Sequence, residues 1–175
     1  IDVMEIAHKD ALSEAFMEAC SEMDIPIARD YNGGDYEGAH YTQMSQTNAK
    51  RCSTEVGYLR KVRHRSNLTV VTSALVDKLL IKNNQVTGLR YLPLNSAGNP
   101  EASQDIAVSG EVILSAGAIS SPMILERSGI GEAAILEGKG VAVTCDLPGV
   151  GQNLQDHLNV RTTYECTKPI TVNDL

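Results

Sequence analysis

One stretch, residues 110–157, constrains this 175-residue chain more than any other. An apolar run, Val112 to Leu114, stops at Ser115-Ala116-Gly117, and a Ser-Ser-Pro start signal then opens a short amphipathic segment, Met123 to Arg127. This order predicts a strand, a tight turn and a helix. In an α/β sheet such a turn brings backbone N–H groups to a ligand at the carboxyl end of a strand, because small residues let the ligand approach the chain closely.

Glycine and proline fix the path of the chain beyond this helix. Ser128-Gly129-Ile130-Gly131 precedes a short helical run, and a β-branched run from Val141 to Thr144 leads to Leu147-Pro148-Gly149-Val150-Gly151. Gly129-x-Gly131-x-x-Ala134 also matches a loose dinucleotide-binding fingerprint. That fingerprint needs a strand before its first glycine, whereas Met123 to Arg127 is predicted to be helical, so we reject it.

Several blocks of the sequence resemble one known family. GAISSPMILERSGIG (117–131) followed by DLPGVGQNLQDH (146–157) resembles, in order and spacing, the second signature of the glucose–methanol–choline (GMC) family of flavin-dependent alcohol oxidoreductases. The similarity extends to DYNGGDYEG (30–38), RCSTEVGYL (51–59) and NLTVVTSALVDKLL (67–80). Ala49 departs from the pattern, since relatives commonly carry glycine there. Within the family, the general resemblance is to the choline-dehydrogenase-like subgroup.

The resemblance implies a mixed α/β (α+β) fold: part of an FAD/NAD(P)-binding, Rossmann-like flavin domain with a β-meander, plus pieces of an α+β substrate domain. It assigns residues 1–65 to a first substrate-domain segment, 66–155 to the middle of the FAD-binding domain, and 156–175 to the start of a second substrate-domain segment. The family's glycine fingerprint lies near the start of the full protein and has no counterpart here. We therefore expect a central fragment, and a first residue other than Met agrees with that.

The same resemblance implies FAD as the cofactor. It places the backbone of Val76 against the adenine, and the turn of Ser115, Ala116 and Gly117 beside the ribose or pyrophosphate. From the residues alone, Val76 is a plain core valine, and both interpretations stay open. The implied reaction is hydride transfer from an alcohol carbon to flavin N5, with the electrons passing to oxygen or a quinone-like acceptor. The implied partners are a small-molecule alcohol, that acceptor and the rest of the enzyme polypeptide.

No residue of this chain is predicted to be the catalytic base. Asp156-His157 invites that interpretation, because a carboxylate can orient an imidazole. Adjacent side chains seldom face each other, however, and the family's catalytic histidine lies near the carboxyl terminus of the full protein. His157 is therefore predicted to hold a loop. The alternative function is a structural or binding fragment with no activity of its own.

The other elements follow from periodicity. Residues 8–23 predict an amphipathic surface helix, and Ser53 to Arg65 predicts a second helix with Ser53 as its N-cap. Residues 35–49 are polar and aperiodic, which indicates a solvated loop or, by the resemblance, a covering segment near the active site. Strands are expected over 68–72, 76–82, 86–92 and 106–114, the middle two joined through Asn83-Asn84 as a hairpin.

Composition limits the partners. A net charge of -7 argues against nucleic acid and anionic membrane surfaces. No apolar run approaches the ~20 residues of a transmembrane segment and no charged leader precedes an apolar core, so we expect a cytoplasmic or membrane-peripheral location. The 4 cysteines lack C-x-x-C spacing, which predicts reduced, mostly buried thiols and no zinc or other metal site. A 42% apolar content permits a single core that buries roughly 70% of the unfolded surface.

Overall fold

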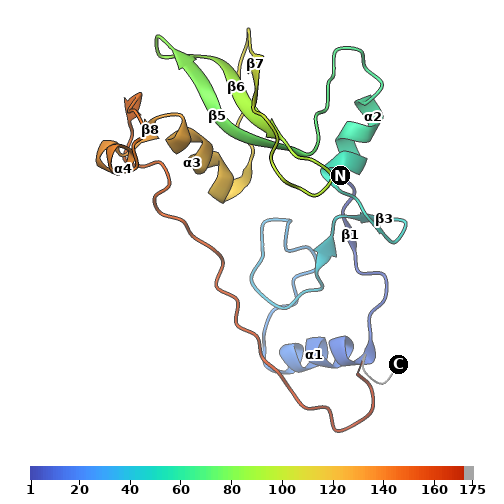
Figure 1. Ribbon diagram of the computed structural model, residues 1–175. Helices are drawn as coiled ribbons and strands as arrows, with labels where there is room; N and C mark the ends of the chain where they lie inside the picture. The colour runs from blue at the N-terminus through green and yellow to red at the C-terminus, as the bar shows by residue number, and fades with distance from the viewer. Residues whose placement is uncertain (172–175) are drawn as a thin grey trace. The chain divides into compact units, whose positions relative to one another are not determined.

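The computed structural model describes residues 1–171 (Figure 1). The chain forms two compact units, one made of Ile1–Thr69 together with the chain from Arg161 onward, the other of Val70–Val160. The second unit combines helices with a sheet, and the first combines helices with short strand pairs. The mixed α/β class predicted from the sequence is confirmed. Within residues 1–171, no helix has the length and apolar character needed to cross a membrane.

The first unit contains α1 (Ala11–Glu22), which confirms the predicted helix. Asp10 caps it, since its carboxylate accepts the N–H groups of Leu12 and Ser13 at 3.0 and 2.9 Å, and these bonds lower the pKa of Asp10. The apolar face of α1 is not covered within this unit, because Phe16 is 55% exposed. The same unit contains two short antiparallel strand pairs: β1 (Met4–Glu5) with β2 (Gln43–Met44), and β3 (Gln46–Thr47) with β4 (Lys50–Arg51).

The helix predicted from Ser53 to Arg65 is shorter and differently wound. η1 (Glu55–Leu59) is a π-helical turn, and it continues into α2 (Arg60–Val62). Ser53 Oγ does accept the Val56 N–H, at 3.4 Å. The buried Gly57 lies so close to Ile1 that a β-carbon on it would be 3.1 Å from the Ile1 side chain. Glycine lowers helix propensity, which weakens the regular helix predicted here at this position.

The second unit is built on an antiparallel meander in the order β5-β6-β7, with β5 (Ala74–Lys82), β6 (Gln85–Pro93) and β7 (Gln104–Ala107). Asn83 and Asn84 form the turn between the first two strands with φ of 51° and 59°, as a tight two-residue hairpin requires. The predicted hairpin is confirmed. Its register shifts twice, between Val76 and Lys78 and between Leu80 and Ile81.

Two strand predictions are wrong. Residues 68–72 form no strand, and the strand predicted over 106–114 ends at Ala107. A strand requires a neighbour that bonds its N–H and C=O groups. The Val108 N–H still donates to the Thr87 carbonyl at 2.9 Å, but within residues 1–171 neither 68–72 nor 109–114 pairs with a strand. Ile113 is consequently 82% exposed. The hydrophobic pattern indicated strand propensity correctly but could not supply the pairing partner.

α3 (Gly117–Arg127) packs against β5, and Figure 1 shows it running alongside the hairpin. It begins at Gly117 rather than after the Ser-Ser-Pro signal, so Pro122 lies inside it. The reason is local, because Ser121 Oγ accepts the Ala116 N–H at 3.0 Å and so satisfies a donor at the start of the helix.

The chain then makes a short parallel strand pair around a helix. β8 (Ile130–Gly131) pairs with β9 (Cys145–Asp146), and α4 (Ala133–Gly138) connects them. α4 ends in a Schellman motif, in which the Val141 N–H donates to the Leu136 carbonyl and the Gly140 N–H to the Glu137 carbonyl, both at 2.9 Å. A helix, not a strand, precedes Gly129, so rejection of the dinucleotide fingerprint is confirmed.

The core is small for a chain of this length. Among residues 1–171, the buried apolar side chains are those of Cys20, Cys52, Leu79, Ile124 and Leu136. The chain exposes 14106 Å². A compact monomer of this mass exposes roughly 8,300 Å², and two compact domains of half the mass together roughly 10,000 Å². The single core permitted by composition is therefore not formed, and apolar surface that a complete domain would bury remains exposed.

Candidate functional site

The predicted cofactor turn lies at the start of α3. Ser115, Ala116 and Gly117 are all exposed. Gly117 has φ of +88°, and no atom lies within 4 Å of where its β-carbon would stand. Only glycine adopts this backbone conformation without strain. The turn therefore presents bare backbone at the N-terminal end of a helix, where the helix dipole favours negative charge.

Val76, the fourth predicted cofactor residue, lies on β5. It is half-buried and pairs with Tyr91, directly before the register shift between Val76 and Lys78. Since α3 packs against β5, the structure brings together the two elements that carry the predicted residues. The assignments of Val76, Ser115, Ala116 and Gly117 to the cofactor stay predictions.

Ser128 is a residue that the sequence gave no reason to single out, apart from its place in the Ser-Gly-x-Gly punctuation. It is 9% exposed. Its hydroxyl accepts the Leu79 N–H at 2.8 Å and donates to the Ile124 carbonyl at 2.5 Å. The bond to Leu79 connects the end of α3 to β5 across 49 positions of sequence, and the bond to Ile124 lies within α3 and its cap.

The segment after α3 is held by a compact hydrogen-bond network. The Gly129 carbonyl accepts the N–H groups of Thr144 and Cys145 at 2.7 and 3.0 Å, and Thr144 Oγ1 donates to the Ser128 carbonyl at 3.3 Å. Asp146 Oδ1 accepts the Ala133 N–H at 3.0 Å, which satisfies an open donor at the start of α4. The glycine and proline positions predicted that the path of this segment is fixed, and these hydrogen bonds are what hold it.

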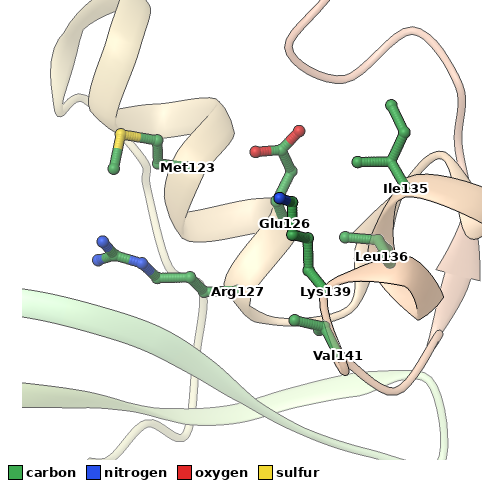
Figure 2. Close-up of a pocket in the computed structure, with 7 residues that line it drawn as sticks. All are labelled: Met123, Glu126, Arg127, Ile135, Leu136, Lys139 and Val141. Carbon is green, nitrogen blue, oxygen red and sulfur yellow. The ribbon is translucent and has the colours of Figure 1, made fainter.

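The cavities of this unit differ in size. One of about 460 Å³ is lined in part by Leu79, Ser128 and Thr144, and one of about 360 Å³ in part by Ile81 and Cys145, but none of the four predicted cofactor residues lines either. Figure 2 shows the residues that line a smaller cavity between α3 and α4, whose volume is about 190 Å³. Another small cavity, of about 250 Å³, is lined in part by Ala118, the residue after Gly117. Binding sites for cofactor-sized ligands are commonly ~300–1,000 Å³, so neither of these two smaller cavities would enclose a whole FAD. The cavity in Figure 2 is lined by apolar groups with charged side chains among them: Met123, Glu126, Arg127, Ile135, Leu136, Lys139 and Val141. None of the four predicted cofactor residues lines it.

Other candidate groups show no catalytic arrangement. The His157 backbone N–H donates to Asp156 Oδ1 at 2.8 Å, and within residues 1–171 its exposed imidazole makes no hydrogen bond or ion pair. A loop-holding role for His157 therefore requires a partner beyond the described residues. Cys20 and Cys52 are buried, but Cys145 is exposed, so the prediction of mostly buried thiols is only half right. The described part of the chain contains no group of three His, Cys, Asp or Glu placed to hold a metal ion.

An antiparallel meander with α3 packed against its first strand, and the glycine turn at the start of α3, form the mixed helix-and-sheet unit that carries the four predicted cofactor residues. The chain belongs to the GMC oxidoreductase family, whose family model matches residues 1–159. The resemblance inferred from the sequence is thereby confirmed.

Three relatives show how far the similarity reaches. The chain is 41% identical to an oxygen-dependent choline dehydrogenase of Pseudomonas putida over 95% of its own length and 29% of the relative's. It is 40% identical to a mitochondrial choline dehydrogenase of Mus musculus over 93% of its length and 26% of the relative's. A solved FAD-dependent oxidoreductase from Chaetomium thermophilum matches 88% of this chain and 26% of that chain, with a TM-score of 0.81 and 30% identity. The chain thus spans less than a third of each of these relatives.

Proposed function

We propose that this chain is the central portion of an FAD-dependent oxidoreductase that oxidises an alcohol to an aldehyde. The observation that carries the proposal is the 41% identity, over 95% of this chain, to a protein named choline dehydrogenase. Choline is therefore the first alcohol to test. The relative's name also favours oxygen over a quinone as the electron acceptor.

The residues present fit one edge of FAD. The first N–H groups of α3 lack partners within the helix, and the Ala116 N–H already donates to Ser121. The turn therefore offers the N–H groups of Gly117 and Ala118 to a pyrophosphate, with open space at Gly117 for close approach. Val76 offers its backbone to the adenine from β5. When bound, FAD supplies the acceptor for the hydride that leaves the alcohol carbon.

The role of this chain is to bind and orient, and the base that removes the hydroxyl proton lies elsewhere in the polypeptide. The exposed area of 14106 Å² supports this division, because a chain with so much uncovered surface needs further polypeptide to complete its core. The division of the structure at Thr69 and at Val160 supports assigning residues 66–155 to the flavin domain, with 1–65 and 156–175 in the substrate domain. A fragment with no activity of its own remains the second candidate for the isolated chain.

The test is anaerobic flavin reduction in the full-length protein that carries this chain. The purified protein is mixed with choline and with a panel of primary alcohols, and bleaching of the oxidised flavin absorbance is followed. Bleaching by one alcohol class identifies the reductive substrate, and oxygen consumption against reduction of a quinone analogue then identifies the acceptor. A protein that copurifies with flavin but is bleached by no alcohol would contradict the proposed reaction, and a protein without flavin would contradict the cofactor.

A further inference from the structure

Ser128 occupies an unusual position, because it is a buried polar side chain at the end of a helix with both hydrogen-bonding capacities used. Its hydroxyl accepts from the Leu79 N–H and donates to the Ile124 carbonyl, and the residue is 9% exposed. A buried hydroxyl that both donates and accepts a hydrogen bond is held in one orientation, since breaking either bond leaves a buried polar group unpaired.

The Leu79 N–H belongs to the outer strand of the sheet. β5 is at the edge of the order β5-β6-β7, so β6 is its only strand neighbour among the described residues. Leu79 pairs with Leu89, yet its N–H is directed at Ser128 on α3. An edge strand needs such a partner, because its outward N–H groups are otherwise open. The hydroxyl of Ser128 therefore fastens β5 to the end of α3.

This anchor joins the two elements that carry the predicted cofactor contacts. Val76 is three residues before Leu79, which is roughly 10 Å along a strand. Gly117 is at the opposite end of the 11-residue helix α3, roughly 16 Å from Ser128 along its axis. A register shift separates Val76 from Lys78, so the pairing with β6 alone holds this part of β5 less firmly.

We propose that Ser128 is a positioning residue for the cofactor: its hydroxyl sets the position of Val76 on β5 relative to the Ser115-Ala116-Gly117 turn of α3. This inference rests on the proposed function, because it assumes that both elements contact FAD. Loss of the hydroxyl leaves the Leu79 N–H without a partner and lets β5 shift along α3. FAD, which must be contacted by both elements at once, then binds more weakly.

The test uses the full-length flavoprotein with four readouts: reconstitution of the apoprotein with FAD, visible circular dichroism of the bound flavin, and thermal unfolding with and without FAD. Ser128→Ala is expected to raise the Kd for FAD about tenfold and to change the flavin dichroism. Ser128→Thr, which keeps the hydroxyl, is expected to retain both wild-type values. Thr87→Val is the matched control, because Thr87 Oγ1 bonds only to the Leu80 carbonyl within the hairpin, at 3.1 Å, and not to α3.

Each outcome distinguishes positioning from plain stability. A purely structural serine would lower the thermal stability of the apoprotein while leaving the Kd for FAD and the flavin dichroism unchanged, and that result would overturn the inference. If Ser128→Ala does not fold, Ser128→Cys keeps the side-chain size with a much weaker hydrogen-bonding group, and a wild-type Kd for FAD in that variant overturns it equally. A wild-type protein that binds no FAD refutes the proposed function itself, whereas wild-type binding with unaffected variants refutes only the role of Ser128.

Discussion

Gly129 is the position where the structure predicts the sharpest response to a single methyl group. It has φ of +83°, and a β-carbon there would overlap the Ala142 carbonyl oxygen and lie 2.7 Å from Thr144 Oγ1. Thr144 belongs to the hydrogen-bond network that holds β9 against the end of α3, and Ala142 lies two residues before it in the same segment. Gly129→Ala must therefore strain the backbone and also push this network apart.

The magnitude follows from adding the two effects. A left-handed conformation costs an L-residue about 1–2 kcal/mol, and overpacking against rigid neighbours costs about 1–3 kcal/mol. The free energy of unfolding should thus fall by about 2–5 kcal/mol in Gly129→Ala. Two nearby glycines are matched controls. Gly140 has φ of +71° with open space around it, so Gly140→Ala should lose only the backbone part, about 1–2 kcal/mol. Gly138 has open space and no left-handed φ, so Gly138→Ala should lose nothing.

The assay is urea unfolding of the full-length protein, combined with hydrogen exchange of peptides that span residues 117–150. Hydrogen exchange reports local opening, which matters because a protein with several domains need not unfold in one step. Gly138→Ala is expected to be the most stable of the three variants, Gly140→Ala the next and Gly129→Ala the least stable. Equal losses for Gly140→Ala and Gly129→Ala would refute the steric part of the reasoning, and a loss at Gly138→Ala would refute the assignment of open space.

Three further outcomes are expected. Gly117→Val should lower flavin occupancy of the purified full-length protein, since valine tolerates φ of +88° poorly; unchanged occupancy would remove the turn from the cofactor. His157→Asn should keep the rate of anaerobic flavin reduction within about tenfold of wild type, because His157 is not predicted to be the general base. Loss of a general base typically lowers the rate by about 10²–10⁴, so a thousandfold loss would make His157 catalytic. Arg90 lowers the pKa of Asp105, so Asp105→Asn should destabilise the protein above about pH 4, with the difference from wild type vanishing as pH falls through the lowered pKa. An undiminished difference in acid would contradict that ion pair.

The sequence by itself determined the family and the local elements. The glycine-rich blocks identified a GMC oxidoreductase, which the family model over residues 1–159 confirms. The Asn83-Asn84 turn and a helix within residues 8–23 were also predicted, because turn chemistry and side-chain periodicity act over a few neighbouring residues. The mixed α/β class followed from the family resemblance.

Only the tertiary structure decided which patterns found partners. Residues 109–114 have the composition of a strand but no strand to pair with among the described residues, and Phe16 lies on an apolar helix face that its unit does not cover. Ser128 shows the converse, since its bond to Leu79 joins positions 49 residues apart. Strand pairing, burial and such long-range hydrogen bonds depend on groups that are distant in sequence, and periodicity reports the propensity of a segment without identifying the surface that satisfies it.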